Sequence, residues 1–343
     1  MLQADGAAVP RSPGSLYTDY LFKRLACVSS ATGSAPNSQL RGSCFKPEFP
    51  YKSDGWHVGQ LRSFLLLSDT RVMSLIDRET HFEFGENWRS YSKTIDQNRI
   101  DQAIEGIKKL FPGGLGDRTV LDIGCGSGLH SFAALSVGAT SVMAIDIDEN
   151  SVATTRQLLA SRAPNSNWDT RVVSIFDAPT EELGLFDVVY SWGVLHHTGD
   201  MWRAIDCATK FVKPGGQFAI AIYSATACDA IWKAEKRLYA NAPRPVQWII
   251  RQAYIAAFLT ARTLRSWENP ATYIRSYSKM RGMNFSHDVH DWLGGYPYET
   301  ATAAELGGRI CSMGFIEERS FPLPQTLGLF GSGCHEFVFR KLG

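Results

Sequence analysis

This chain of 343 residues has no closely spaced cysteine pairs, almost no net charge and no long apolar run. Its seven cysteines are an odd number and no two have the CxxC spacing, so neither a disulfide framework nor a zinc cluster is expected. A net charge of +1 gives no argument for a nucleic-acid partner. The longest apolar run, 248–259, contains Arg251 and Gln252 and is shorter than the roughly 20 residues that cross a bilayer. With no signal-peptide pattern at its beginning, the sequence favours a cytoplasmic protein with reduced thiols and no resident metal.

The chain divides by composition into a poorly structured beginning and a regular remainder. Residues 1–60 are rich in Ser, Gly, Pro and Ala, so we expect 1–75 to be a flexible or poorly ordered extension. The 44% hydrophobic and 20% charged content of the whole chain is typical of a folded globular protein.

Apolar runs and helical patterns alternate from residue 119 onward. Strands are predicted at 119–123, 141–146, 171–176, 186–192, 217–224, 315–321 and 336–340, and helices at 129–137, 150–163 and 202–212. This alternation predicts a parallel sheet with helices on both faces. Residues 225–300 interrupt it with aromatic-rich sequence of helical character. A capping box, Thr302 to Glu305, then opens another helix.

The strongest motif is a glycine-rich loop after the first predicted strand. It reads Asp122-Ile-Gly124-Cys125-Gly126-Ser-Gly128. Glycines allow tight turns and close approach of a ligand to the backbone. Taken alone, such a loop can be a simple turn. Its G-x-G-x-G spacing differs from the G-x-G-x-x-G of dinucleotide sites, and the Asp122 carboxylate would repel a pyrophosphate but suits an ammonium group.

Two further aspartates follow the next two predicted strands. Asp146 ends one strand and can accept hydrogen bonds from both ribose hydroxyls of an adenosine. Asp177 follows the predicted strand 171–176 and can accept a hydrogen bond from the adenine amino group, while the apolar neighbours Ile147 and Phe176 pack against the cofactor. Either aspartate alone is as readily explained as a turn residue. Their occurrence at successive strand ends favours a binding site for an adenosine-containing cofactor.

The order of these motifs resembles the Rossmann-like S-adenosylmethionine-dependent methyltransferases, nearest to the quinone-biosynthesis O-methyltransferase group. After the glycine loop come Ala-Ile-Asp146, Ile-Phe-Asp177, the segment 186–197 and Lys-Pro-Gly-Gly at 213–216. The resemblance covers about 81–343 and implies an α/β fold with a seven-stranded, mostly parallel, doubly wound sheet. The last strand would be antiparallel. The catalytic domain would comprise 81–224 and 301–343, with a helical insertion at 225–300 after the fifth strand.

The same resemblance implies S-adenosylmethionine as the cofactor and assigns roles to matching residues. Gly124, Gly126 and Gly128 would line its methionine end, Asp146 would hold the ribose and Asp177 the adenine. Cys125 and Ser191 complete the predicted lining. Trp88 and Arg99 match a segment that covers the cofactor and binds its carboxylate, although a packed Trp and a solvated Arg explain them equally well.

His196 and His197 follow the fourth predicted strand, where the methyl group would lie. A histidine there can remove a proton from a hydroxyl as the methyl group transfers, because its pKa is near neutrality. The alternative is that one of them caps the next helix or packs beneath the loop.

The insertion is basic and aromatic. Residues 231–281 hold ten Lys and Arg against two Glu, interleaved with aromatic side chains. They form either a lid for an anionic or lipid-like acceptor, a peripheral membrane contact, or a solvated helical cap. We expect His287, Tyr296 and the late His335 to line the acceptor pocket.

The sequence thus predicts an enzyme that methylates a small-molecule acceptor at a hydroxyl oxygen. Methylation of nitrogen or carbon, and a non-catalytic cofactor-binding module, are the alternatives. The motifs are specific for the cofactor and leave the acceptor open.

Overall fold

The computed structural model describes residues 95–281 and 285–343. The chain divides into two units, Met1–Arg78 and Glu79–Gly343, and all that follows concerns the second. The predicted extension 1–75 and Trp88 lie outside the described residues, so those two expectations stay predictions.

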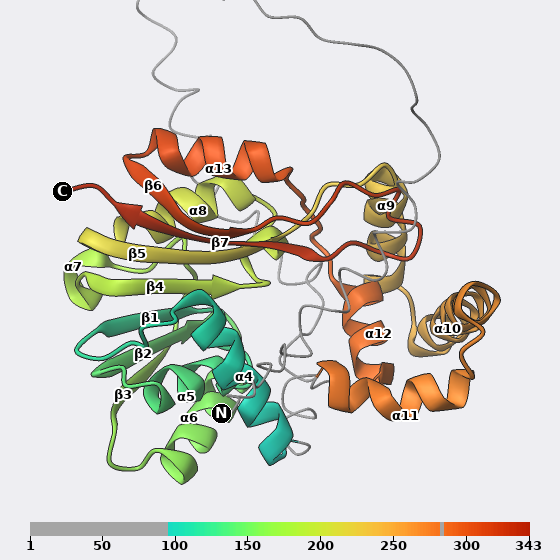
Figure 1. Ribbon diagram of the computed structural model, residues 1–343, viewed down its shortest axis with the longest axis horizontal. Coiled ribbons are helices and arrows are strands. Elements are labelled where there is room, and N and C mark those ends of the chain that lie inside the picture. The colour runs from blue at the N-terminus through green and yellow to red at the C-terminus, as the bar shows by residue number, and fades with distance from the viewer. Residues whose placement is uncertain (1–94, 282–284) are drawn as a thin grey trace, which may run out of the picture. The chain divides into compact units, whose positions relative to one another are not determined.

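Seven strands form one sheet in the order β3-β2-β1-β4-β5-β7-β6 (Figure 1). They are β1 Thr119–Ile123, β2 Ser141–Asp146, β3 Asn167–Val172, β4 Phe186–Trp192, β5 Val212–Tyr223, β6 Phe315–Phe321 and β7 Cys334–Lys341. Strands β1 to β5 pair in parallel, and β7 pairs antiparallel with both β5 and β6. The predicted seven-stranded sheet with an antiparallel last strand is confirmed.

Helices cover both faces of the sheet, as expected for a doubly wound fold (Figure 1). They are α4 Gln97–Leu110, α5 Leu129–Ser136, α6 Glu149–Arg162, α7 Thr180–Leu183, α8 Met201–Lys210 and α13 Ala303–Ser312, with a short 3₁₀ turn, η1, at Leu195–His197. Alternate residues of strand β1 belong to the hydrophobic cores on the two faces of the sheet. Leu121 packs with residues of α8 and α13, and its neighbour Val120 packs with residues of α4 and α5. The predicted capping box is present, since Thr302 and Glu305 exchange hydrogen bonds at the start of α13.

The position predicted for the third strand is wrong. The strand expected at 171–176 lies earlier, at Asn167–Val172, and Asp177 follows it through a loop. As an edge strand, β3 is mostly exposed and polar, so it lacks the apolar run that marks the central strands. The apolar run that follows is a loop that packs Ile175 into the core. The turn expected at 213–216 is instead an irregular segment inside β5, where the register with β4 shifts.

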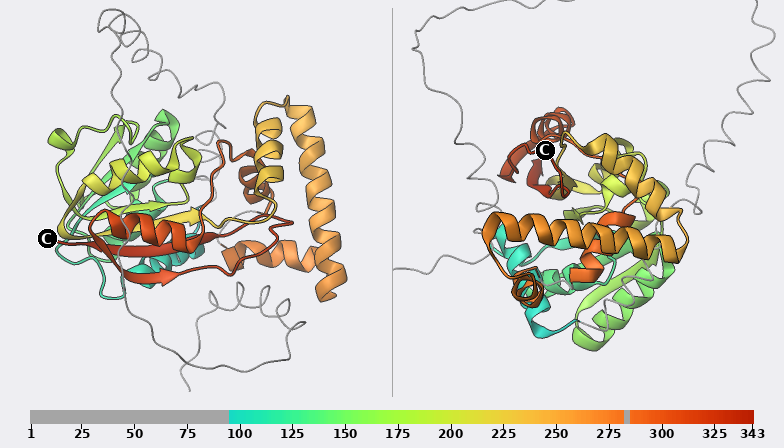
Figure 2. Two further views of the ribbon diagram at one scale, coloured as in Figure 1. Left: turned by 90° about the horizontal axis from the view of Figure 1, so that it is seen from above. Right: turned by 90° about the vertical axis from the view of Figure 1, so that its right-hand side faces the viewer.

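The predicted helical insertion after β5 is confirmed. It contains α9 Asp229–Ala240, α10 Arg244–Ser266, α11 Pro270–Arg281 and α12 Phe285–Gly294. Figures 1 and 2 show these helices beyond the carboxyl ends of the parallel strands. Aromatic rings join them into a small core, in which Phe258 lies 5.9 Å from Tyr273 and 6.2 Å from Phe285 between ring centroids. No helix among residues 95–281 and 285–343 combines the length and apolarity needed to cross a membrane.

Candidate active site

The glycine loop between β1 and α5 requires glycine for steric reasons. Gly124, Gly126 and Gly128 all have positive φ, at 77°, 52° and 78°. A Cβ atom on Gly124 would lie 2.4 Å from Cγ1 of Val194, and one on Gly128 would lie 2.8 Å from Cα of Thr155. The loop therefore packs closely against the segment after β4 on one side and against α6 on the other.

Asp146 links the glycine loop to the end of β2. Its Oδ2 accepts a hydrogen bond from the Gly126 N–H at 3.0 Å, and its Oδ1 accepts one from the Asp148 N–H at 3.0 Å. Burial raises the pKa of Asp146 to about 6, although these backbone hydrogen bonds oppose the shift. A half-buried carboxylate with one oxygen directed at the glycine loop is suited to a ligand that brings hydroxyl donors or positive charge.

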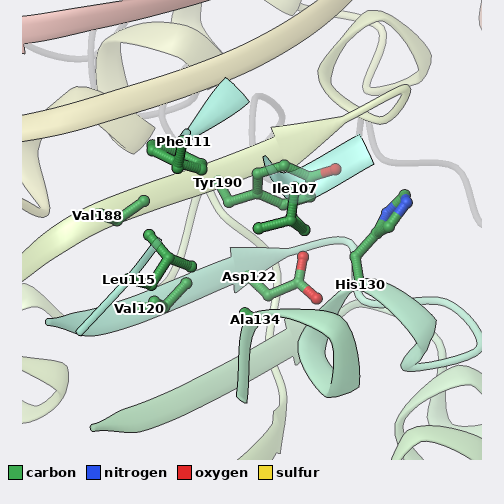
Figure 3. Close-up of a pocket in the computed structure, with 9 residues that line it drawn as sticks. All are labelled: Ile107, Phe111, Leu115, Val120, Asp122, His130, Ala134, Val188 and Tyr190. Carbon is green, nitrogen blue, oxygen red and sulfur yellow. The ribbon is translucent and has the colours of Figure 1, made fainter. Parts of the chain in front are cut away.

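Asp122 is a second carboxylate beneath the loop, and it is buried. The pKa of Asp122 is raised to about 6, chiefly by burial. A hydrogen bond from Ser131 Oγ, at 2.5 Å, opposes this shift, and the nearby charge of Asp146 adds to it. Figure 3 shows Asp122 with His130 and Tyr190 around a cavity of about 10 Å³, the space that one water molecule needs. Burial lowers the pKa of His130 to about 4, so this histidine is neutral.

The other predicted cofactor residues lie around the same end of the sheet. Cys125 is buried and its Sγ accepts from Thr155 Oγ1 at 3.3 Å, and burial raises the pKa of this thiol well above its ordinary value. The buried Ser191 Oγ donates to the Ile123 carbonyl at 3.3 Å. Three more predicted cofactor residues are accessible to solvent: Ile147 is 42% exposed, Phe176 is half-buried and Asp177 is exposed.

Arg99 lies in the first turn of α4. It is buried, and its Nη1 lies 3.3 Å from Oδ2 of Asp96, the N-cap residue of that helix. Its predicted contact with the cofactor carboxylate stays a prediction.

The two histidines after β4 have different surroundings. His196 is fully buried, and neither ring nitrogen has a hydrogen-bond partner among the described residues. Its ring centroid lies 4.0 Å from that of Tyr223 and 4.3 Å from that of His197. Burial, assisted by the neighbouring His197 and Lys236, lowers the pKa of His196 well below 6.5. A ring held neutral in this way is a poor proton acceptor.

His197 is half-buried and oriented by the segment after α12. Its Nδ1 lies 2.7 Å from the carbonyl oxygen of Pro297. Because a carbonyl only accepts, Nδ1 carries the hydrogen, and in the neutral ring Nε2 is the basic nitrogen. Gly295 packs against the ring edge, since a Cβ there would lie 2.8 Å from Cε1 of His197. This arrangement defines both the tautomer and the orientation of the imidazole.

An aromatic cluster around a buried lysine adjoins the histidines, and sequence reasoning missed it. Tyr223 lies 5.4 Å from Trp292, which lies 6.1 Å from Tyr298, all between ring centroids. Lys236 Nζ lies 3.7 Å from the Trp292 ring centroid and donates to the Trp292 carbonyl. Burial lowers the pKa of Lys236 to about 7, although the adjacent Glu235 opposes the shift.

A sequence signal for this lysine did exist. Trp232, Lys236 and Tyr239 are spaced four and three apart, so they share the buried face of α9. A lysine at a core position of an amphipathic helix marks a special environment.

The predicted acceptor residues are dispersed. His287 is half-buried in α12, and Tyr296 is half-buried in the loop that follows it. His335 is buried in β7, where its Nδ1 accepts a hydrogen bond from the Leu323 N–H at 2.9 Å. That contact holds the loop before β7. Among residues 95–281 and 285–343, no group of three or more His, Cys, Asp or Glu side chains is arranged to hold a metal ion.

Comparison with known proteins identifies the family. Residues 116–276 match the family model described as Methyltransferase domain. This chain contains a methyltransferase domain, similar to those of S-adenosylmethionine-dependent methyltransferases. The resemblance stated from the motifs is confirmed, and so is the predicted cofactor of the methyltransferase domain.

Three curated relatives show how far the similarity reaches. A 27-O-demethylrifamycin SV methyltransferase from Amycolatopsis mediterranei (strain S699) is 32% identical over 40% of this chain and 51% of its own length. A tRNA U34 carboxymethyltransferase from Methylococcus capsulatus is 37% identical over 31% of this chain and 32% of its own. A ubiquinone biosynthesis O-methyltransferase from Xanthomonas axonopodis pv. citri is 33% identical over 41% of this chain and 59% of its own. The chain spans less than two thirds of each of these relatives.

The residues of the methyltransferase domain suit this cofactor. S-adenosylmethionine carries a sulfonium and an ammonium group, and a cation near Asp122 and Asp146 would offset the mutual repulsion of these two carboxylates. The positive φ of all three glycines gives the loop its tight turn, and the absence of a Cβ lets it pack against Val194 and Thr155.

Proposed function

We propose that this protein transfers the methyl group of S-adenosylmethionine to a hydroxyl oxygen of a small-molecule acceptor. The observation that carries the proposal is the orientation of His197, whose Nδ1–H is held by the Pro297 carbonyl so that Nε2 is the basic nitrogen. A hydroxyl acceptor loses its proton as the methyl group arrives, and an oriented base serves that step. Two of the relatives above are named for O-methylation, which supports the same acceptor atom.

In this proposal each element of the site has a separate task. The glycine loop contacts the methionine part of the cofactor, Asp146 accepts from the ribose hydroxyls, and Phe176 packs on the adenine, with Asp177 beside it. The cofactor, when bound, supplies the electrophilic methyl group. His197 holds the acceptor hydroxyl and takes its proton, and the neutral His196 supports the ring of His197 from behind.

The aromatic cluster supports an acceptor with a flat apolar part and a polar or anionic group. Tyr223, Trp292 and Tyr298 offer ring surfaces beside His196. One buried polar atom of this region, Trp292 Nε1, has no hydrogen-bond partner among the described residues. Buried polar groups are normally satisfied, so an unpaired one near an active site favours a polar ligand there. Lys236, whose pKa is lowered by burial to about 7, adds positive charge in its protonated form.

The acceptor atom is tested with methyl-labelled S-adenosylmethionine. Purified protein is incubated with aromatic hydroxy acids and with matched amines in which the hydroxyl is replaced. The expected result is label in a methoxy product, with S-adenosylhomocysteine formed in equal amount. Label only on nitrogen or carbon would contradict O-methylation. Tight cofactor binding without turnover on any acceptor, including compounds extracted from the host cell, would favour the non-catalytic module.

The affinity for S-adenosylmethionine is expected to depend on pH through Asp146. Because its pKa is raised to about 6, the carboxyl group is mostly protonated at pH 5 and ionised at pH 7. Only the ionised form accepts from both ribose hydroxyls, so affinity should rise about tenfold from pH 5 to pH 7. Calorimetric titration at several pH values measures this.

Two asparagine variants separate the contributions of the two carboxylates. Asp146→Asn should weaken binding and flatten the pH profile, whereas Asp122→Asn should keep a rise with pH because Asp146 is retained. A wild-type affinity that does not change between pH 5 and pH 7 would remove Asp146 from the binding site.

A further inference from the structure

Exposed large apolar side chains gather on the helical insertion and on the loop beside it. A single exposed apolar side chain is common and needs no explanation, but a group of them marks an interaction surface. They are Ile231 and Leu238 on α9, Val246, Trp248, Ile249 and Leu264 on α10, Trp267 after it, Ile274 on α11, and Leu327 and Leu329 before β7.

Helix α10 has one face toward the protein and one face without a partner among the described residues. On the inner face, the Tyr254 ring contacts Trp232, and Arg262 pairs with Glu268 at 2.6 Å. None of the 23 residues of α10 is fully buried. Figure 2 shows α10 as the outermost helix, lying across the end of the domain.

The outer face of α10 is uncharged and mostly apolar, with the exposed Thr260 among its apolar residues. Val246, Ile249 and Leu264 are 39%, 59% and 72% exposed, and the exposed alanines 253, 256 and 257 lie between them. Tryptophans stand toward its two ends, with Trp248 57% and Trp267 88% exposed. A helix of this length is about 34 Å long, so this face is an extended strip.

The charges around this strip have one sign. Over residues 229–277, the exposed charged side chains are all cations: Lys233, Arg237, Arg244, Arg265 and Arg275. The three carboxylates of that range are half-buried, and two of them are engaged within the fold. Glu268 pairs with Arg262, and Asp229 accepts from Thr300 Oγ1 at 2.6 Å. Helix α10 itself contains no acidic residue.

We propose that the outer face of α10 docks on an anionic lipid surface. Helices that lie in a membrane interface combine an apolar face, tryptophan and flanking Lys or Arg, and anionic headgroups attract those cations. A second copy of the chain fits less well, because a twofold contact through this face would bring the same cations near each other. Since α9 to α12 lie at the carboxyl-end side of the sheet, docking brings the candidate active site to the membrane-facing end. This inference does not depend on the acceptor atom.

The test is flotation of the full-length protein with vesicles of phosphatidylcholine alone and with phosphatidylglycerol added. The wild-type protein should bind only the anionic vesicles, and less at high salt, because salt screens surface charge. The double variant Ile249→Glu/Leu264→Glu should bind the anionic vesicles with an apparent affinity at least about tenfold lower. Arg237→Gln/Arg265→Gln/Arg275→Gln should lose the salt-sensitive part.

A control variant changes two exposed leucines at the opposite end of the strands. Leu185 precedes β4 and Leu342 follows β7, at 44% and 54% exposure, and Leu185→Glu/Leu342→Glu should bind vesicles like wild type. Thermal unfolding and S-adenosylhomocysteine binding verify that each variant is folded. Absence of binding to anionic vesicles at low salt, or equal binding by wild type and the α10 variant, overturns the proposal. A wild-type dimer in sedimentation that the α10 variant abolishes would assign the face to a second copy instead.

Discussion

Replacement of His197 by alanine is expected to lower kcat by about 10²–10⁴-fold while S-adenosylmethionine still binds. The reason is the hydrogen bond from Nδ1–H to the Pro297 carbonyl, which leaves Nε2 as the basic nitrogen. The measurement is the rate of S-adenosylhomocysteine formation at saturating acceptor, together with calorimetric titration of the cofactor. A fall in cofactor affinity alone would point to a binding role instead.

His196 supplies the matched control. Its ring is buried, neutral and without a hydrogen-bond partner among the described residues, so phenylalanine can replace it with little electrostatic change. His196→Phe should therefore keep kcat within a few-fold of wild type. If His196→Phe loses activity as His197→Ala does, the pair acts as a unit. If both variants turn over normally, methyl transfer depends on positioning alone.

Gly128→Ala is expected to destabilise the fold and to abolish measurable cofactor binding. Its φ of 78° costs a non-glycine residue about 1–2 kcal/mol. The added Cβ would also lie 2.8 Å from the Thr155 Cα, and such overpacking costs typically about 1–3 kcal/mol. The free energy of unfolding should thus fall by about 2–5 kcal/mol, measured by urea titration.

Gly184 supplies a control for backbone strain away from the glycine loop. Its φ is 77°, its ψ of −166° lies in a region that only glycine adopts readily, and a Cβ there would meet nothing within 4 Å. Gly184→Ala should therefore be destabilised by backbone strain alone, by about 1–3 kcal/mol, and should bind the cofactor like wild type. Loss of cofactor binding in Gly184→Ala as well would show that general destabilisation, and not the glycine loop, explains the loss in Gly128→Ala.

The catalytic framework could be predicted from the sequence because its signals are local. Strands β1, β2 and β4 were predicted with the bounds that the structure shows, since each is an apolar run ending in a glycine or a polar turn. The capping box before α13 is likewise a contact between residues three apart. Such features depend on neighbouring residues, so periodicity and turn chemistry are enough to locate them.

Strand β3 failed for the opposite reason. It is placed by its backbone pairing with β2, and an edge strand that is mostly exposed does not need an apolar run of its own. The apolar sequence after it belongs to a loop that covers the core, as the burial of Ile175 shows. Local hydrophobicity identifies buried residues, but it does not distinguish a buried loop from a strand.

By itself, the sequence determined the fold class, the methyltransferase domain and its cofactor, because the glycine loop and Asp146 at the end of the next strand are short-range patterns. Only the tertiary structure decided how His196 and His197 differ, since their surroundings come from Tyr223, Lys236 and Pro297, which are distant along the chain. It also decided which face of α10 remains exposed. Burial and hydrogen-bond partners arise from packing between distant segments, and these properties give each histidine and each helix face its chemistry.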